Sequence, residues 1–224
     1  MKDNEYIRNG YRINYTNVVH ALKSLVQFHN ESINMWSHMI CSLVCLMIIF
    51  VLYWSYLGRG KDWEIFSNVG TWPLYAFLFS AIFCLCCSFA FHCFNCLNKT
   101  AHDWLNRLDY SGIAILIIGS CYPPFYYVFY SKLEFVYIYL SIITFIGISC
   151  FIVSMLPKFN HNKYRVCRAA MFITFGLSIG FLGIIHIVFI GVDINPDKSV
   201  WFYISMGFFY VLGGSVYGMR MPER

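Results

Sequence analysis

Charge is scarce in this sequence. Asp, Glu, Lys and Arg make up 12% of its 224 residues, whereas a soluble globular domain has about 25%. Six windows hold no charged side chain at all: residues 39–57, 72–91, 111–131, 135–156, 169–192 and 199–219. Because a helix of about 20 apolar residues crosses the roughly 30 Å hydrocarbon core of a bilayer, the scarcity argues against a soluble domain and predicts a membrane protein.

Strict alternation of apolar and polar residues is also missing, which argues against the strands of about 10 residues that build a membrane barrel. We therefore expect an all-α fold, a polytopic membrane helix bundle with six spans. The predicted spans are residues 38–57, 72–95, 110–130, 135–156, 169–191 and 199–218. Residues 1–37 form a separate N-terminal segment, and residues 38–224 form the bundle.

Basic runs are absent, so the net charge of +5 calls for no nucleic-acid partner. The positive charge is instead concentrated in particular segments outside the apolar windows. Twelve of the 16 Lys and Arg residues fall in the N-terminal segment, in the second and fourth loops and after the sixth window. Positive residues concentrate on the cytosolic side of membrane proteins. The distribution predicts a cytosolic N-terminus and, after six crossings, a cytosolic C-terminus.

The ten cysteines lack the spacing of a disulfide framework, because most are scattered in or beside the apolar windows. Cysteines placed in this way are typical of small apolar filler. The pair Cys93 and Cys96 fits a C-x-x-C pattern, but no second pair completes a tetrahedral metal site. Cysteine therefore gives only a weak indication of a metal or redox centre.

The segment before the first span has an amphipathic pattern. Apolar residues recur at helical spacing, and polar residues occupy the opposite face; they are Val18, Leu22, Leu25 and Val26 against His20, Lys23 and Gln27. This predicts a helix that lies on the cytosolic leaflet. A short helix that packs under the bundle is an equal alternative.

Two polar residues stand in "SFAFHCFNCL", at the end of the second window. Ser88 and His92 are four residues apart and so share a helical face. With a cytosolic N-terminus, both lie near the cytosolic end of the second span, and Asp109 lies at the cytosolic start of the third. The three side chains therefore share one depth, where an unpaired ionisable group costs at least a few kcal/mol.

This convergence has two interpretations. Asp109 and His92 can be part of a structural hydrogen-bond cluster, with Asp109 as a helix cap. Alternatively, His92 ligates a metal beside Asp109. A catalytic zinc site needs about three protein ligands and a water, so one histidine is not enough, and the nearest further candidates are His29 and His38.

A series of motifs resembles the progestin and adipoQ receptor family, which includes the adiponectin receptors and haemolysin-III-type proteins. In chain order they are "GYR", "FHNESINMWSH", "SFAFH", "LDYSGIAILIIGS", "PPFYYVFY", "KYRVCRA", "FGLS" and "RMPER". The resemblance covers essentially the whole chain. It implies a bundle of seven helices with a cytosolic N-terminus and a zinc ion near the cytosolic side.

The resemblance also implies roles for the three residues. His92 is then a zinc ligand, Asp109 lies beside the metal-bound water, and Ser88 orients the site. Two further histidines are expected from an H-x-x-x-H motif on a seventh helix, and this sequence ends before such a motif. We expect either a fragment with an incomplete site or a true six-span protein.

Three functions follow from the resemblance: a zinc-dependent hydrolase of ceramide-like lipid amides, a receptor without enzymatic activity, or an inactive scaffold. The expected partners are membrane lipids, with a ceramide-like lipid as substrate or an extracellular protein or steroid as ligand. The expected location is the plasma membrane or an internal membrane.

Glycine and proline residues in the windows bear on helix packing and helix shape. Two G-x-x-x-G spacings, Gly176–Gly180 and Gly214–Gly218, predict close contacts between helices. Pro123 and Pro124 predict a kink or an end of the regular helix in the third span.

Overall fold

The computed structural model describes residues 9–13, 15, 17–58, 70–190 and 199–221; within these ranges, the side chains of residues 56–58, 179, 182–190 and 199–203 are not described. Every regular element in this part of the chain is helical. In chain order the elements are α1 (Val18–Lys23), η1 (Ser24–Val26), α2 (Ser32–Gly58), α4 (Trp72–Phe94), α5 (Lys99–Val128), α6 (Leu133–Met155), η3 (Pro157–Asn160), η4 (Asn162–Tyr164), α7 (Arg165–Ile190) and α8 (Ser199–Met219).

The long helices coincide with the charge-free windows, so the all-α prediction is confirmed for the described residues. Four helical segments are long and apolar enough to cross a bilayer: Ser32–Ser55, Trp72–Phe94, Lys99–Val128 and Leu133–Met155. Helices α7 and α8 occupy the fifth and sixth windows. The count of six spans and the cytosolic side of the N-terminus stay predictions.

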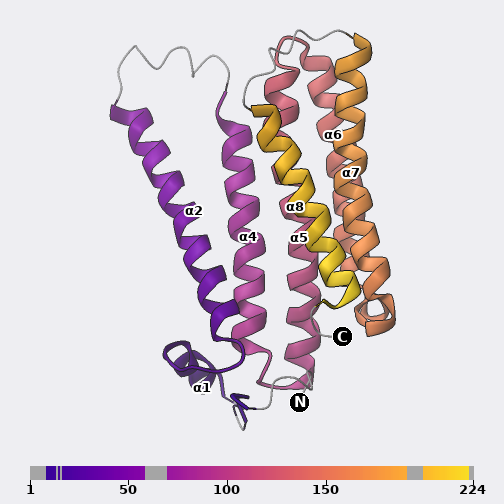
Figure 1. The fold of residues 1–224 in the computed structure, drawn as a ribbon. Coiled ribbons are helices and arrows are strands. Elements are labelled where there is room, and N and C mark those ends of the chain that lie inside the picture. The colour runs from indigo at the N-terminus through magenta and orange to yellow at the C-terminus, as the bar shows by residue number, and fades with distance from the viewer. Residues whose placement is uncertain (1–8, 14, 16, 59–69, 191–198, 222–224) are drawn as a thin grey trace.

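The helices form one elongated bundle (Figure 1). Helix α4 lies between α2 and α5, α5 packs against α6, and α7 pairs with α8. The short helix α1 lies below α2, at the same end of the bundle as the C-terminal end of α8. The C-terminal end of α4, which carries His92, is at this end too.

Helix α5 begins earlier than the sequence predicted. The stretch 98–106 was expected to be a loop, but the Asn98 side chain accepts a hydrogen bond from the Ala101 backbone amide at 2.8 Å and caps a helix that starts at Lys99. Such a cap satisfies a backbone donor that the helix itself leaves unpaired. Asp109 therefore lies inside α5, ten residues after its start, and the idea that it caps the helix is wrong.

The two prolines also lie inside α5. The helix continues through Pro123 and Pro124 to Val128, so of the two predicted outcomes an end of the regular helix is wrong and a kink stays a prediction. Because proline has no amide hydrogen to donate to the carbonyl four residues earlier, the helix continues here without those two backbone hydrogen bonds.

A buried core joins α5, α6 and α7 through residues such as Ile118, Ile143 and Phe175. Helix α7 meets α8 through glycines, as the spacing predicted. A side chain at Gly176 would meet the Tyr210 ring at 2.7 Å, and one at Gly214 would meet Ile173 at 2.7 Å. Gly180 has open space around it, so the first motif uses one of its two glycines.

The amphipathic segment is shorter than predicted. Helix α1 has six residues, and its Ala21 is fully buried at the end of α4. The apolar residues Val18, Val19 and Leu22 are about half exposed. This short helix therefore packs against the bundle and also leaves an apolar face exposed, so it has features of both predicted alternatives.

Candidate functional site

The C-terminal end of α4 carries the polar residues that the sequence singled out. Ser88 is buried, with 4% of its surface exposed, and His92 follows one turn later. Across the contact between α4 and α5, Ser88 lies close enough to the carboxylate of Asp109 to interact with it. Asp109 also lies close enough to His92 and His38 to interact with both electrostatically. The structure thus brings together the three residues expected at one depth.

Glu31 is a further member of this cluster. It lies directly before α2, and its Oε2 is 2.8 Å from Nδ1 of His92. Burial alone would raise the pKa of the Glu31 carboxyl, but the hydrogen bond and charge of His92, with help from Asn34 and Arg12, hold that pKa below its ordinary value. Glu31 is therefore a carboxylate at neutral pH.

His38, one of the two further histidines considered, also faces the site. Its ring lies edge-on to that of His92, with the ring centroids 5.7 Å apart. Its Nδ1 atom is buried and has no hydrogen-bond partner among the described residues. Buried polar atoms are normally satisfied by protein, water or a bound group. His29, the other candidate, is engaged elsewhere, with Nε2 3.2 Å from the Ser24 carbonyl oxygen.

Arg12 secures the backbone beneath His92. Its guanidinium donates hydrogen bonds to the carbonyl oxygens of His92 (2.6 Å) and Cys93 (2.7 Å) and to Oδ1 of Asn95 (2.8 Å). The last carbonyls of a helix have no partner within the helix. A planar, permanently charged donor is well suited to bind several of them at once.

Among the described residues, the cysteines near the site belong to no group of three potential metal ligands. All ten cysteines are free thiols, which agrees with the absence of a disulfide framework. Cys93 is fully buried, and the Cys96 thiol donates a hydrogen bond of 3.8 Å to the Cys93 carbonyl. Both cysteines lie at or just after the end of α4.

The donor chemistry fits part of a zinc shell. His92 is an imidazole with a carboxylate on one ring nitrogen, the arrangement that commonly supports a zinc-bound histidine. Asp109 and the unpartnered nitrogen of His38 lie beside it. In the ranges that the structure describes, however, no three His, Cys, Asp or Glu side chains are grouped closely enough to hold a metal ion. The assignment of His92 as a metal ligand stays a prediction.

Sequence reasoning had not assigned Glu31 and Arg12 to the site. Both are far from His92 in the chain, and no spacing connects them to it. The only signal was indirect: "GYR" and "FHNESINMWSH" contain them, and both were among the motifs that carried the family resemblance.

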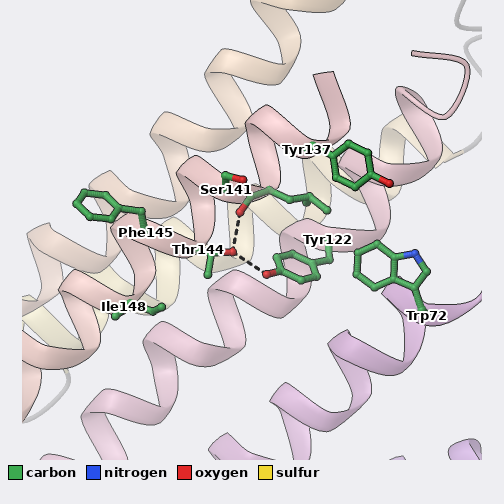
Figure 2. Close-up of a pocket in the computed structure, with 8 residues that line it drawn as sticks. Trp72, Tyr122, Tyr137, Ser141, Thr144, Phe145 and Ile148 are labelled. Atoms are coloured by element: carbon green, nitrogen blue, oxygen red, sulfur yellow. Dashed lines mark hydrogen bonds between the residues drawn. The ribbon is translucent and has the colours of Figure 1, made fainter. Parts of the chain in front are cut away.

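A second feature lies at the opposite end of the bundle (Figure 2). A groove of about 530 Å³ is open to the outside and is mainly apolar, with lining residues Trp72, Tyr122, Tyr137, Leu140, Ser141, Thr144, Phe145 and Ile148. Its few hydroxyls include Tyr122, which donates a hydrogen bond of 2.6 Å to Thr144. Trp72, at one end of the groove, begins α4 and lies about 30 Å along that helix from His92.

Comparison with known proteins identifies the family of the chain. The family model described as "Haemolysin-III related" matches residues 26–224. The whole chain is 36% identical to heptahelical transmembrane protein 1 of Arabidopsis thaliana, and it covers 68% of that protein. It is 35% identical to progestin and adipoQ receptor-like protein 1 of Caenorhabditis elegans and 34% identical to the adiponectin receptor protein of Drosophila melanogaster. The chain spans about half the length of these two relatives.

Proposed function

The chain belongs to the haemolysin-III related family of multi-pass membrane proteins, and from this premise we propose that the cluster around His92 is part of a zinc-dependent site that hydrolyses lipid amides of the ceramide type. The observation that carries the proposal is the meeting of Ser88, His92 and Asp109 across α4 and α5. His92 would hold the metal, and the other ligands would come from outside the described residues.

The chemistry that bound zinc supplies is a more acidic water, with a pKa of about 7, and a polarised amide carbonyl. Asp109 acts as the general base that accepts the proton of the attacking water and delivers it to the departing amine. Ser88 lies beside Asp109, where a hydrogen bond donated by its hydroxyl would fix the direction of the carboxylate. Because the cluster lies between apolar helices, the acyl chain of a substrate can stay in the hydrocarbon.

The test is the release of fatty acid from an N-acyl sphingosine, with added zinc, by the purified chain fused to a seventh helix that carries the expected H-x-x-x-H motif, in lipid nanodiscs. Asp109→Asn keeps the shape of the side chain but removes the base, so the rate should fall by about 100-fold or more. Asp103→Asn, also on α5 but with its side chain 48% exposed, is the control and should be unaffected. No release by the fused chain, or equal release by Asp109→Asn, would refute the proposal.

A receptor function is the second candidate, and the groove at the other end of the bundle favours it. Its volume of about 530 Å³ lies within the range of small-molecule sites, about 300–1,000 Å³. The predicted topology places this end outside the cytosol. Saturable binding of a steroid that is lost in Trp72→Ala, without fatty-acid release, would favour this function over hydrolysis.

A further inference from the structure

Glu31 and His92 form a closely held pair at the entrance to α2. The separation of 2.8 Å between Oε2 and Nδ1 is that of a strong, charge-assisted hydrogen bond. The side chains of His92 and Glu31 are only 17% and 20% exposed. A second pair at the same end of the bundle, His102 and Asp103, is longer at 3.4 Å and more exposed, at 36% and 48%. Only the first pair is short and sheltered.

The carboxylate of Glu31 is fixed in place from several directions. Asn30 and Asn95 donate to its Oε1 at 3.2 and 3.4 Å, and Asn34 donates to its Oε2 at 3.3 Å. Asn95 is in turn held by Arg12. The position of the carboxylate is therefore set by the N-terminal segment and by the end of α4 together, and it does not depend on His92 alone.

This contact determines which nitrogen of His92 carries a proton. An ionised carboxylate can only accept a hydrogen bond, so Nδ1 must be the donor. The neutral ring then leaves Nε2 without a proton, and an unprotonated ring nitrogen is the atom that binds a metal. The hydrogen bond also restricts rotation of the ring, because the carboxylate and the backbone beneath His92 are both fixed.

We infer that Glu31 is a positioning residue for the metal site: it holds His92 in the tautomer and orientation in which Nε2 is free for zinc, and Arg12 secures the backbone from which His92 projects. This role rests on the proposed function. It also gives the N-terminal segment a part in the site, since Arg12 and Glu31 both precede the first long helix.

The first experiment examines His92 without the metal. The full chain is labelled with ¹⁵N in histidine, freed of metal with a chelator, and studied by NMR at neutral pH, with His92→Gln to assign the signal. We expect a protonated Nδ1 and a bare Nε2, and Glu31→Ala should abolish this preference. A proton on Nε2 in the unmodified chain, or an unchanged spectrum in Glu31→Ala, would overturn the inference.

The second experiment measures zinc affinity by competition with a chelating dye. Loss of a carboxylate that supports a metal-bound histidine weakens binding about 10- to 100-fold, and we expect this for Glu31→Ala. Glu31→Gln retains an acceptor oxygen and should lose less zinc affinity than Glu31→Ala. It replaces the alanine variant in this measurement if that variant does not fold. Asp103→Ala removes the carboxylate of the other His pair and should leave the affinity unchanged.

The outcomes separate the two proposals. If the unmodified chain binds no zinc, the proposed function fails, while the tautomer of His92 still decides whether Glu31 positions the ring. If the unmodified chain binds zinc and both Glu31 variants bind it equally well, the positioning role is wrong and the proposed function stands.

Discussion

Replacement of Arg12 should release the N-terminal segment from the bundle. In Arg12→Met the side chain keeps much of its apolar length but loses three hydrogen bonds, of 2.6, 2.7 and 2.8 Å, to the end of α4. A hydrogen bond to a charged group contributes about 1.5–3 kcal/mol. Water can replace part of the lost hydrogen bonding at this half-buried position. We therefore expect the free energy that holds the N-terminal segment on the bundle to fall by about 3 kcal/mol, the value of one to two such bonds.

Cys93 reports the release directly. Its thiol is fully buried and lies 3.9 Å from the Ala21 carbonyl oxygen of α1. A cost of about 3 kcal/mol corresponds to on the order of a 100-fold larger open population. The rate at which a maleimide labels Cys93 in nanodiscs, measured by mass spectrometry, should rise by that factor.

Two controls show whether the opening is local. Cys150 is buried on α6, away from the segment, and its labelling should not change. Lys23→Met removes a positive charge from exposed α1 without removing a described contact, so Cys93 should stay protected in that variant. Unchanged labelling of Cys93 in Arg12→Met would refute the view that Arg12 holds the segment on α4. Equal increases at Cys93 and Cys150 would instead indicate global unfolding.

Three other predictions concern the bundle. Gly119→Ala would drive a methyl group into a side chain of α4 and should destabilise the protein by about 1–3 kcal/mol in a denaturation titration, whereas Gly213→Ala, with open space around it, should not. Tyr217→Phe removes the hydroxyl that accepts two hydrogen bonds from the buried Arg168, at 3.0 and 3.2 Å, and should cost about 1–3 kcal/mol in the same titration. A cysteine introduced within residues 58–71 should react with an impermeant maleimide on intact cells; reaction only after permeabilisation would reverse the predicted topology.

The positions of the long helices could be predicted because a bilayer demands long apolar segments, and charge is absent only there. The first residues of these helices could not be predicted, because the first helical turns are polar and come before the apolar stretch. Helix α5 begins at Lys99, where the Asn98 side chain caps it, although its first turns read as a polar loop. Helix α2 begins at Ser32, whose hydroxyl accepts a hydrogen bond from the His29 amide.

The candidate site was predictable to a similar extent. Ser88 and Asp109 meet because one ends a span and the other lies near the start of the next, which the sequence order alone implies. Glu31 reaches His92 through the fold of the N-terminal segment, and no local pattern encodes that contact. The functional role of the three predicted residues stays a prediction.

X-ray absorption at the zinc edge of the purified chain tests the central claim most directly, because it reports the atoms bound to the metal. The account predicts imidazole nitrogen at about 2.0–2.1 Å, with less imidazole scattering and at least 10-fold weaker zinc binding in His92→Ala. A sulfur shell at about 2.3 Å, or a spectrum that is the same with and without His92, would contradict it.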